Sequence, residues 1–135
     1  MIRKGCFALW NNKEYELVSY QRQYYLLSKS KVELQNGFTE KEGDGGIFLR
    51  RIAVLELEDA YEVFPYAIYL GYRFTVEGYN ERMHTVALVT NDPFVKEKVA
   101  VQPYGKFEYI IELPEEEVVI KEERIRILGF ENITL

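Results

Sequence analysis

The stretch FPYAIYLGYRFTVEGY at residues 64–79 decides the fold, because two alternating apolar runs flank a short turn in it. The stretch GCFALWNNKEYELVSY at residues 5–20 follows the same pattern 59 positions earlier, without a gap. The same residue classes recur at paired positions: Ala8 and Ala67, Tyr15 and Phe74, Leu17 and Val76, Tyr20 and Tyr79. Recurrence at a fixed offset indicates internal repeats.

The offset of 59 holds further along the chain, where Gly46 meets Gly105 and Phe48 meets Phe107. We therefore predict a single domain over residues 1–135, built of two repeats, 1–63 and 64–128. The alternative is that two sheet-forming stretches align only because all strands share a period of two residues.

Each half is predicted to contain four strands, because short alternating runs are separated by Asn-, Gly- and Gln-containing turns. The predicted strands cover residues 6–10, 15–19, 24–27, 47–53, 66–70, 73–77, 84–89 and 107–113. Apolar spacing predicts a short helix from Leu55 to about Glu62. The fold class is therefore α+β: a mainly antiparallel β-sheet with a few short helices, in which a ββββα unit is duplicated.

Two further helices are expected in the second half. Asn91 or Asp92 is a suitable N-cap for a helix from Pro93 to about Val99. The acidic run after Pro114 is typical of a helix N-terminus, although a strand over residues 118–120 is the alternative.

The composition excludes several classes of protein. The chain of 135 residues carries 22 acidic and 17 basic side chains, a formal charge of -5, which disfavours nonspecific binding to nucleic acids and to anionic membranes. The single Cys6 cannot form an internal disulfide, and neither a signal-peptide core nor 18 consecutive apolar residues occur. We expect a cytoplasmic protein with no membrane partner.

Residues for common catalytic chemistry are scarce. His84 is the only histidine and is expected on a partly buried strand, and no general base is recognisable beside Cys6. One histidine and one cysteine cannot supply a zinc site. Residues 43–46, Gly-Asp-Gly-Gly, precede a predicted strand and read as a hairpin loop, not as a phosphate-binding loop. We expect no enzymatic activity, no cofactor and no metal.

Charge is placed unevenly along the chain. Seven glutamates lie between Phe107 and Arg124, against Lys121 alone, and they are Glu108, Glu112, Glu115, Glu116, Glu117, Glu122 and Glu123. Such a run is explained either by a solvated face or by an acidic surface that attracts a cationic partner. Tyr72 and Tyr79, near predicted hairpin turns, could add contact area to that surface, because tyrosine suits protein interfaces.

Spaced aromatic and aliphatic residues also carry a family resemblance. They are Phe7-Ala8-Leu9-Trp10, Tyr15-Glu16-Leu17, Gly37-Phe38, Glu58-Asp59-Ala60-Tyr61 and the run from Tyr66 to Phe74. The pattern resembles small immunity proteins encoded beside secreted polymorphic toxins of Gram-positive bacteria. The resemblance implies a non-enzymatic cytoplasmic protein that binds a cognate toxin domain, often a nuclease, and blocks its active site. It transfers no functional residue.

The leading hypothesis is therefore an immunity protein that neutralises a toxin through an acidic, tyrosine-rich surface and has no direct nucleic-acid partner. One alternative is a structural or regulatory module that self-associates through an open strand edge. A second alternative is a small-molecule binding domain with an aromatic cleft between the two halves. The expected oligomeric state is a monomer or a weak homodimer.

Overall fold

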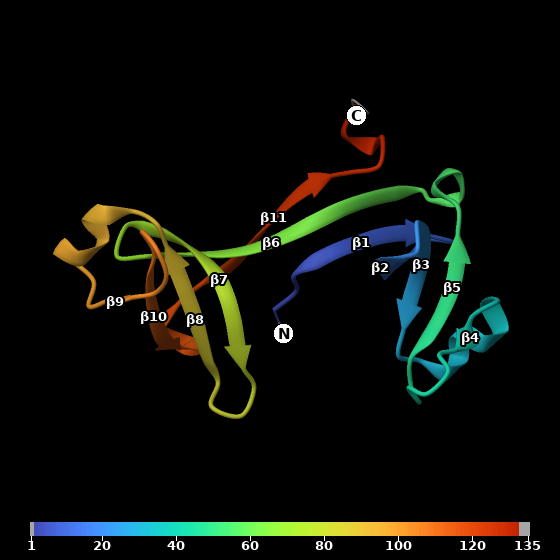
Figure 1. Cartoon of the computed structure of the whole chain (residues 1–135), viewed down its shortest axis with the longest axis horizontal. Helices are drawn as coiled ribbons and strands as arrows, with labels where there is room; N and C mark the ends of the chain where they lie inside the picture. The colour runs from blue at the N-terminus through green and yellow to red at the C-terminus, as the bar shows by residue number, and fades with distance from the viewer. Residues whose placement is uncertain (1, 133–135) are drawn as a thin grey trace. The chain divides into compact units, whose positions relative to one another are not determined.

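The computed structural model describes residues 2–132 (Figure 1). These residues form two compact units, which we call the N-terminal unit, residues 5–63 and 124–132, and the C-terminal unit, residues 2–4 and 64–123. The boundary between Val63 and Phe64 falls inside one long strand. It lies at the peptide bond where the sequence places the boundary between its two repeats.

The N-terminal unit is an antiparallel sheet with the strand order β4-β5-β3-β2-β1-β6. Its strands are β1 (Gly5–Trp10), β2 (Lys13–Tyr20), β3 (Gln23–Ser28), β4 (Thr39–Glu40), β5 (Phe48–Ile52) and the first part of β6 (Asp59–Tyr69). Three short 3-10 helices accompany them: η1 (Lys31–Asn36), η2 (Val54–Glu56) and η5 (Phe130–Asn132).

The C-terminal unit repeats this arrangement with the strand order β9-β10-β8-β7-β6, and β11 pairs with β6. Its elements after β6 are β7 (Tyr72–Asn80), β8 (Thr85–Thr90), η3 (Pro93–Glu97), β9 (Gln102–Pro103), β10 (Tyr109–Pro114), η4 (Glu115–Glu117) and the first part of β11 (Ile120–Arg126), whose residues 124–126 belong to the N-terminal unit. Each unit therefore places a 3-10 helix and a two-residue strand between its third and fourth long strands.

The register between strands also agrees in the two units. Ala8 pairs with Tyr15 as Ala67 pairs with Phe74. In the next ladder, the pair Leu17 and Leu26 corresponds to the pair Val76 and Leu88. These are the apolar positions that the sequence alternation predicts to face inward, and all of them are buried.

The first hairpin turn of each unit has the same backbone geometry. Asn11 and Asn12 have φ values of 54° and 62°, and Leu70 and Gly71 have values of 50° and 86°. Two successive positive φ angles are those of a type I′ turn, whose twist matches that of the flanking strands.

Each unit buries its own cluster of side chains on one face of its sheet. The N-terminal cluster includes Ala8, Tyr15, Leu17, Leu26, Phe38, Phe48 and Ile52. The C-terminal cluster includes Ala67, Phe74, Val76, Val86, Leu88, Val95 and Leu113. We call the opposite side of each sheet its outer face.

The prediction of a mainly antiparallel β-sheet is confirmed, but the helical part of the α+β class is not observed: residues 2–132 contain only 3-10 helices. The helix predicted from Leu55 to Glu62 is wrong, since η2 ends at Glu56 and β6 begins at Asp59. Pairing of Ala60 with Ala8 on β1 outweighs the short helical spacing.

The other two predicted helices shrink to single turns. Asp92 caps η3, because its Oδ1 accepts a hydrogen bond from the Phe94 N–H at 2.9 Å, as the sequence predicts. η4 covers only Glu115–Glu117, and β11 follows it from Ile120. In the part of the chain that the structure describes, no helix is long and apolar enough to cross a membrane.

Candidate functional site

An open groove of 470 Å³ lies on the outer face of the C-terminal unit. We call it the acidic groove, and its lining includes Arg73, Thr75, Glu77, Val89, Asp92 and Glu108. These residues come from β7, from β8, from the cap of η3 and from the loop before β10. Antiparallel pairing therefore joins side chains that are distant in the sequence.

The sheet geometry explains why these side chains meet. Thr75 pairs with Val89, and both alternate with core residues on β7 and β8, so they face outward. The register shifts between Val76 and Gly78, which places Glu77 at an irregularity of β7. Such irregularities often re-aim a side chain near a functional site.

Carboxylates dominate the electrostatics of the acidic groove. Glu77, Asp92 and Glu108 all line it, and Arg73 is the cation among its lining residues. The Arg73 guanidinium lies 2.6 Å from Glu123 Oε2 and stacks over the Tyr66 ring at 3.8 Å, so its charge is locally balanced. The groove therefore presents a net negative charge to a ligand.

Three of the seven predicted glutamates lie on or beside this face. Glu108 lines the groove, and Glu123 neutralises Arg73. Glu112 accepts a hydrogen bond from Thr85 Oγ1 at 2.8 Å on the neighbouring strand. The acidic partner surface expected in this segment stays a prediction for these residues.

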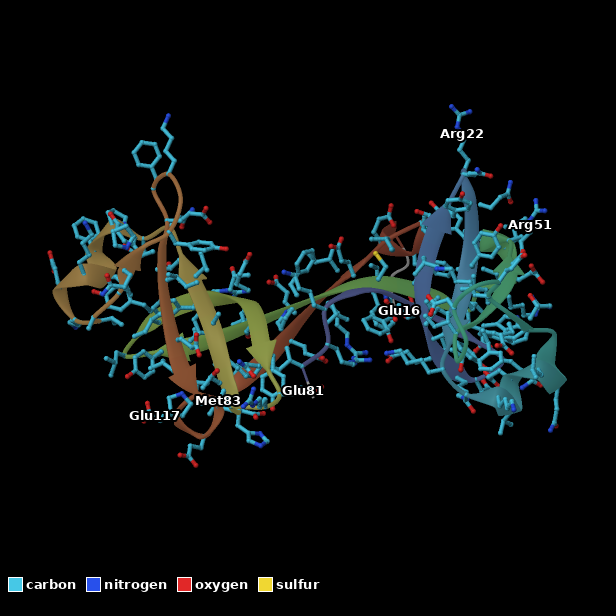
Figure 2. The ribbon with its side chains drawn as sticks, turned by 60° about the horizontal axis from the view of Figure 1, so that its bottom comes forward. Glu16, Arg22, Arg51, Glu81, Met83 and Glu117 are labelled. Carbon is cyan, nitrogen blue, oxygen red and sulfur yellow. The ribbon has the colours of Figure 1, made fainter. Side chains whose placement is uncertain are left out.

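The remaining predicted glutamates lie elsewhere in the C-terminal unit. Glu115, Glu116 and Glu117 form η4, which is tied to the β7–β8 hairpin by a hydrogen bond from the Glu115 N–H to the His84 carbonyl at 2.8 Å. Figure 2 shows Glu117 and Met83 at the same end of this unit. Glu122 forms an ion pair with Arg3 at 3.1 Å. The seven residues therefore do not form one patch.

The two predicted tyrosines use their hydroxyls inside the unit. Both are half-buried against the C-terminal core. Tyr72 donates to the Phe94 carbonyl at 3.2 Å, and Tyr79 donates to Glu115 Oε2 at 2.7 Å. The hydrogen bond to Glu115 raises the pKa of Tyr79. Their rings contribute to packing more than to an open contact surface.

Sequence reasoning missed Glu77 and Asp92. Neither belongs to the glutamate-rich segment, and Asp92 is recognisable in the sequence only as a helix cap. The order in which β7, β8 and β10 pair brings Glu77 and Glu108 to one face, and this order is not predicted from the sequence.

The residues considered for catalysis in the sequence are His84 and Cys6. His84 is exposed in the β7–β8 turn with a φ of 55°, so the expectation of a partly buried strand residue is wrong, and β8 begins one residue later. Burial raises the pKa of the Cys6 thiol, with a smaller contribution from Glu62, which lowers its reactivity. Within residues 2–132, no cluster of three His, Cys, Asp or Glu side chains is arranged to hold a metal ion.

Comparison with known proteins places the chain in a family. A family model described as "Uncharacterised conserved protein UCP033725" matches residues 2–129. No curated protein and no solved structure matches the chain significantly. Because the match covers nearly the whole sequence, the chain belongs to the family UCP033725.

Proposed function

We propose that this protein is a non-enzymatic binding protein of the immunity type, which neutralises a cognate toxin domain by covering a cationic surface of that domain. The acidic groove carries the proposal, because Glu77, Asp92 and Glu108 converge there from three separate segments. Its cation, Arg73, is already paired with Glu123. Cationic side chains of a partner would find complementary charge on this face.

The mechanism follows from the groove's position on a sheet. Strands β7, β8 and β10 form the outer face through antiparallel ladders, and the hydrogen bond from the Phe94 N–H fixes the Asp92 carboxylate before a partner arrives. Preorganisation reduces the entropy lost on binding. Nucleases bind their substrate through cationic grooves, and an acidic face of this kind can occupy such a groove in place of a phosphate backbone.

The proposed surface centres on Glu77, Asp92 and Glu108, with Glu112 beside them on β10. Glu115 and the pair formed by Glu122 and Arg3 are peripheral to it, since they hold elements of the unit together, and Glu116 and Glu117 lie next to Glu115 in η4.

Two of the terminal strands of the sheet are poorly suited to self-association by a strand edge. β4 and β9 contain two residues each, whereas β11, which pairs with β6, contains seven. Pro103 in β9 also lacks the N–H that an added strand would need. Short edges of this kind are a common protection against edge-to-edge pairing.

We further propose that the two units arose by duplication of one sheet-forming unit. Their matching strand order, the matching register of Ala8–Tyr15 and Ala67–Phe74, and the two type I′ turns support this origin. The duplicated unit consists of strands and 3-10 turns, in place of the ββββα unit expected from the sequence.

The test is the affinity for the toxin domain encoded by the adjacent gene, measured by calorimetry from about 50 to about 300 mM NaCl. The variant Glu77→Gln/Glu108→Gln should bind about tenfold more weakly, with a shallower salt dependence. The matched control, Glu116→Gln/Glu117→Gln, removes the same charge outside the groove and should bind as the parent does. Absent binding, or equal losses in both variants, would overturn the proposal.

A further inference from the structure

The N-terminal unit has its own groove on the outer face, with a volume of 760 Å³. Its apolar lining comes from β2, β3, β5 and the residue before β5, and consists of Val18, Tyr20, Tyr25, Leu27, Ile47 and Leu49. We call it the apolar groove. It lies on the side of the sheet opposite the buried cluster that contains Leu17, Leu26 and Phe48.

The apolar groove occupies the same place in its unit as the acidic groove does in the other. Leu27 pairs with Glu16 as Val89 pairs with Thr75. The loop before the fourth long strand is closed in the same way in both units. Ile47 accepts from the Lys41 N–H at 2.7 Å, and Glu108 accepts from the Tyr104 N–H at 2.8 Å.

The two grooves therefore differ in chemistry at matching positions. Val18 and Ile47 stand in the apolar groove where Glu77 and Glu108 stand in the acidic groove. Corresponding positions of the two units thus carry side chains of different chemistry. The strand register matches Phe48 with Tyr109, so the predicted match of Phe48 with Phe107 at an offset of 59 is wrong.

Aromatic surface is left open to solvent in the apolar groove. Tyr20 is 65% exposed, and Tyr25, Leu27 and Leu49 are only partly buried. A contiguous exposed apolar patch commonly marks an interaction site. Tyrosine is also enriched among the residues that dominate binding energy at protein interfaces.

Charged groups of both signs lie at this groove. Lys41 and Glu42 line it, and Lys41 is paired with Asp44 at 3.6 Å. Arg51 pairs in register with Tyr25, and Arg22 lies in the turn that follows Tyr20. Figure 2 shows Arg22 and Arg51 projecting at the same end of the unit. Within residues 2–132, neither of these two guanidinium groups forms an ion pair or a cation–π contact.

We propose that the apolar groove is a second docking site, for a protein segment that carries an aliphatic or aromatic side chain next to a carboxylate. The apolar side chain would pack between Tyr25 and Leu49, and the carboxylate would meet Arg51 or Arg22. Arginine binds carboxylates through two parallel hydrogen bonds, which gives directional specificity. Arg51 and Arg22 would take the opposite charge to that taken by the acidic groove, and the proposal does not depend on the function proposed for that groove.

The test uses a random dodecapeptide library displayed on phage and selected against the intact protein. Selected peptides should be enriched in Asp or Glu close to Leu, Ile or Phe. In fluorescence polarisation, Tyr25→Ser and Arg51→Gln should each weaken a selected peptide about tenfold. Arg51 is exposed, so Arg51→Gln keeps the test informative even if Tyr25→Ser unfolds.

Two matched controls locate the binding. Ile68→Ser alters an exposed apolar residue in the C-terminal unit, and Glu77→Gln/Glu108→Gln alters the acidic groove; both should leave peptide affinity unchanged. The proposal would be overturned if the selected peptides were not enriched in acidic residues, or if Arg51→Gln left their affinity unchanged. Dimers in sedimentation that depend on Tyr25, or binding to phosphatidylserine vesicles that depends on Arg51, would also overturn it.

Discussion

Glu33 and Val95 occupy equivalent positions in the two units, although one side chain is charged and the other is apolar. Each lies in the 3-10 helix that follows the third long strand of its unit, and their exposed fractions are 2% and 0%. The Glu33 N–H donates a hydrogen bond to the Ser30 carbonyl at 3.2 Å, and the Val95 N–H donates one to the Asp92 carbonyl at 3.3 Å. The backbone at this place therefore accepts either kind of side chain.

The surroundings of Glu33 compensate for its burial. Asn36 Nδ2 donates to Glu33 Oε1 at 2.8 Å, and Lys13 Nζ lies 3.7 Å from Oε2. Burial alone would raise the pKa of Glu33, but the nearby Tyr15 hydroxyl, the hydrogen bond from Asn36 and the charge of Lys13 lower it below its ordinary value of 4.5. Burial, with the adjacent carboxylate of Glu33, raises the pKa of Tyr15.

The first prediction concerns stability at low pH. Because the folded pKa of Glu33 is depressed, its contribution is present above pH 4.5 and is lost as pH falls through the folded pKa. The free energy of unfolding, from urea titrations between about pH 6 and pH 3, should fall less steeply in Glu33→Gln than in the parent protein. Parallel curves for the two proteins would contradict this role.

Leu70 carries the second prediction. It adopts a φ of 50° in the β6–β7 turn and is 55% exposed, so its side chain gains little from packing while its backbone is strained. Asn tolerates this conformation, and Asn11 holds the matching position in the other unit. Leu70→Asn should stabilise the protein by about 1 kcal/mol.

Thermal unfolding checks this prediction, with the reverse change as its control. Asn11→Leu should lower the unfolding temperature, because it places leucine in the same left-handed conformation. A lower unfolding temperature for Leu70→Asn would mean that the leucine makes a contact worth more than its backbone strain.

Much of the sheet could be predicted from the sequence, because alternation and turn chemistry are local. The run from Tyr15 to Leu17 and the run from Phe74 to Val76 both show one inward face, and the pair Asn11-Asn12 marks a hairpin. The region after Leu55 was mispredicted because a single helical spacing cannot compete with the pairing of β6 along β1.

The candidate site could be predicted only in part. Glu108, Glu112 and Glu123 stand in one glutamate-rich segment and are visible as a charge run. Glu77 joins them through the pairing of β7 with β8 and of β8 with β10, which depends on strand order. Strand order is a property of the whole sheet and leaves no local signal.

The third prediction is a gain of affinity. Arg73 is the cation of the acidic groove, and it is partly exposed, as is its partner Glu123. Arg73→Gln should tighten binding of the toxin domain severalfold and steepen its salt dependence, with little effect on stability, since exposed pairs contribute about 0–1 kcal/mol. Lys121→Gln removes an exposed cation from β11 outside the groove lining and serves as the control. Weaker binding by Arg73→Gln would place the cationic surface of the partner elsewhere.

The fourth prediction follows from the two buried clusters. Phe48 is 2% exposed in the N-terminal core, and Phe74 is fully buried in the C-terminal core. Truncation of either side chain to alanine leaves a cavity and should cost about 3–5 kcal/mol. Amide hydrogen exchange should rise mainly over β2, β3 and β5 in Phe48→Ala, and mainly over β7, β8 and β10 in Phe74→Ala.

Phe94→Ala is the matched control for both truncations, because Phe94 is an exposed phenylalanine of η3 and should change stability by no more than about 0.5 kcal/mol. Localised exchange would mean that each core supports its own sheet. Exchange that rises equally over both sets of strands in either variant would mean that the two clusters unfold as one cooperative unit. The long strand β6 contributes residues to both clusters, and it is one of the covalent routes by which such cooperation would pass.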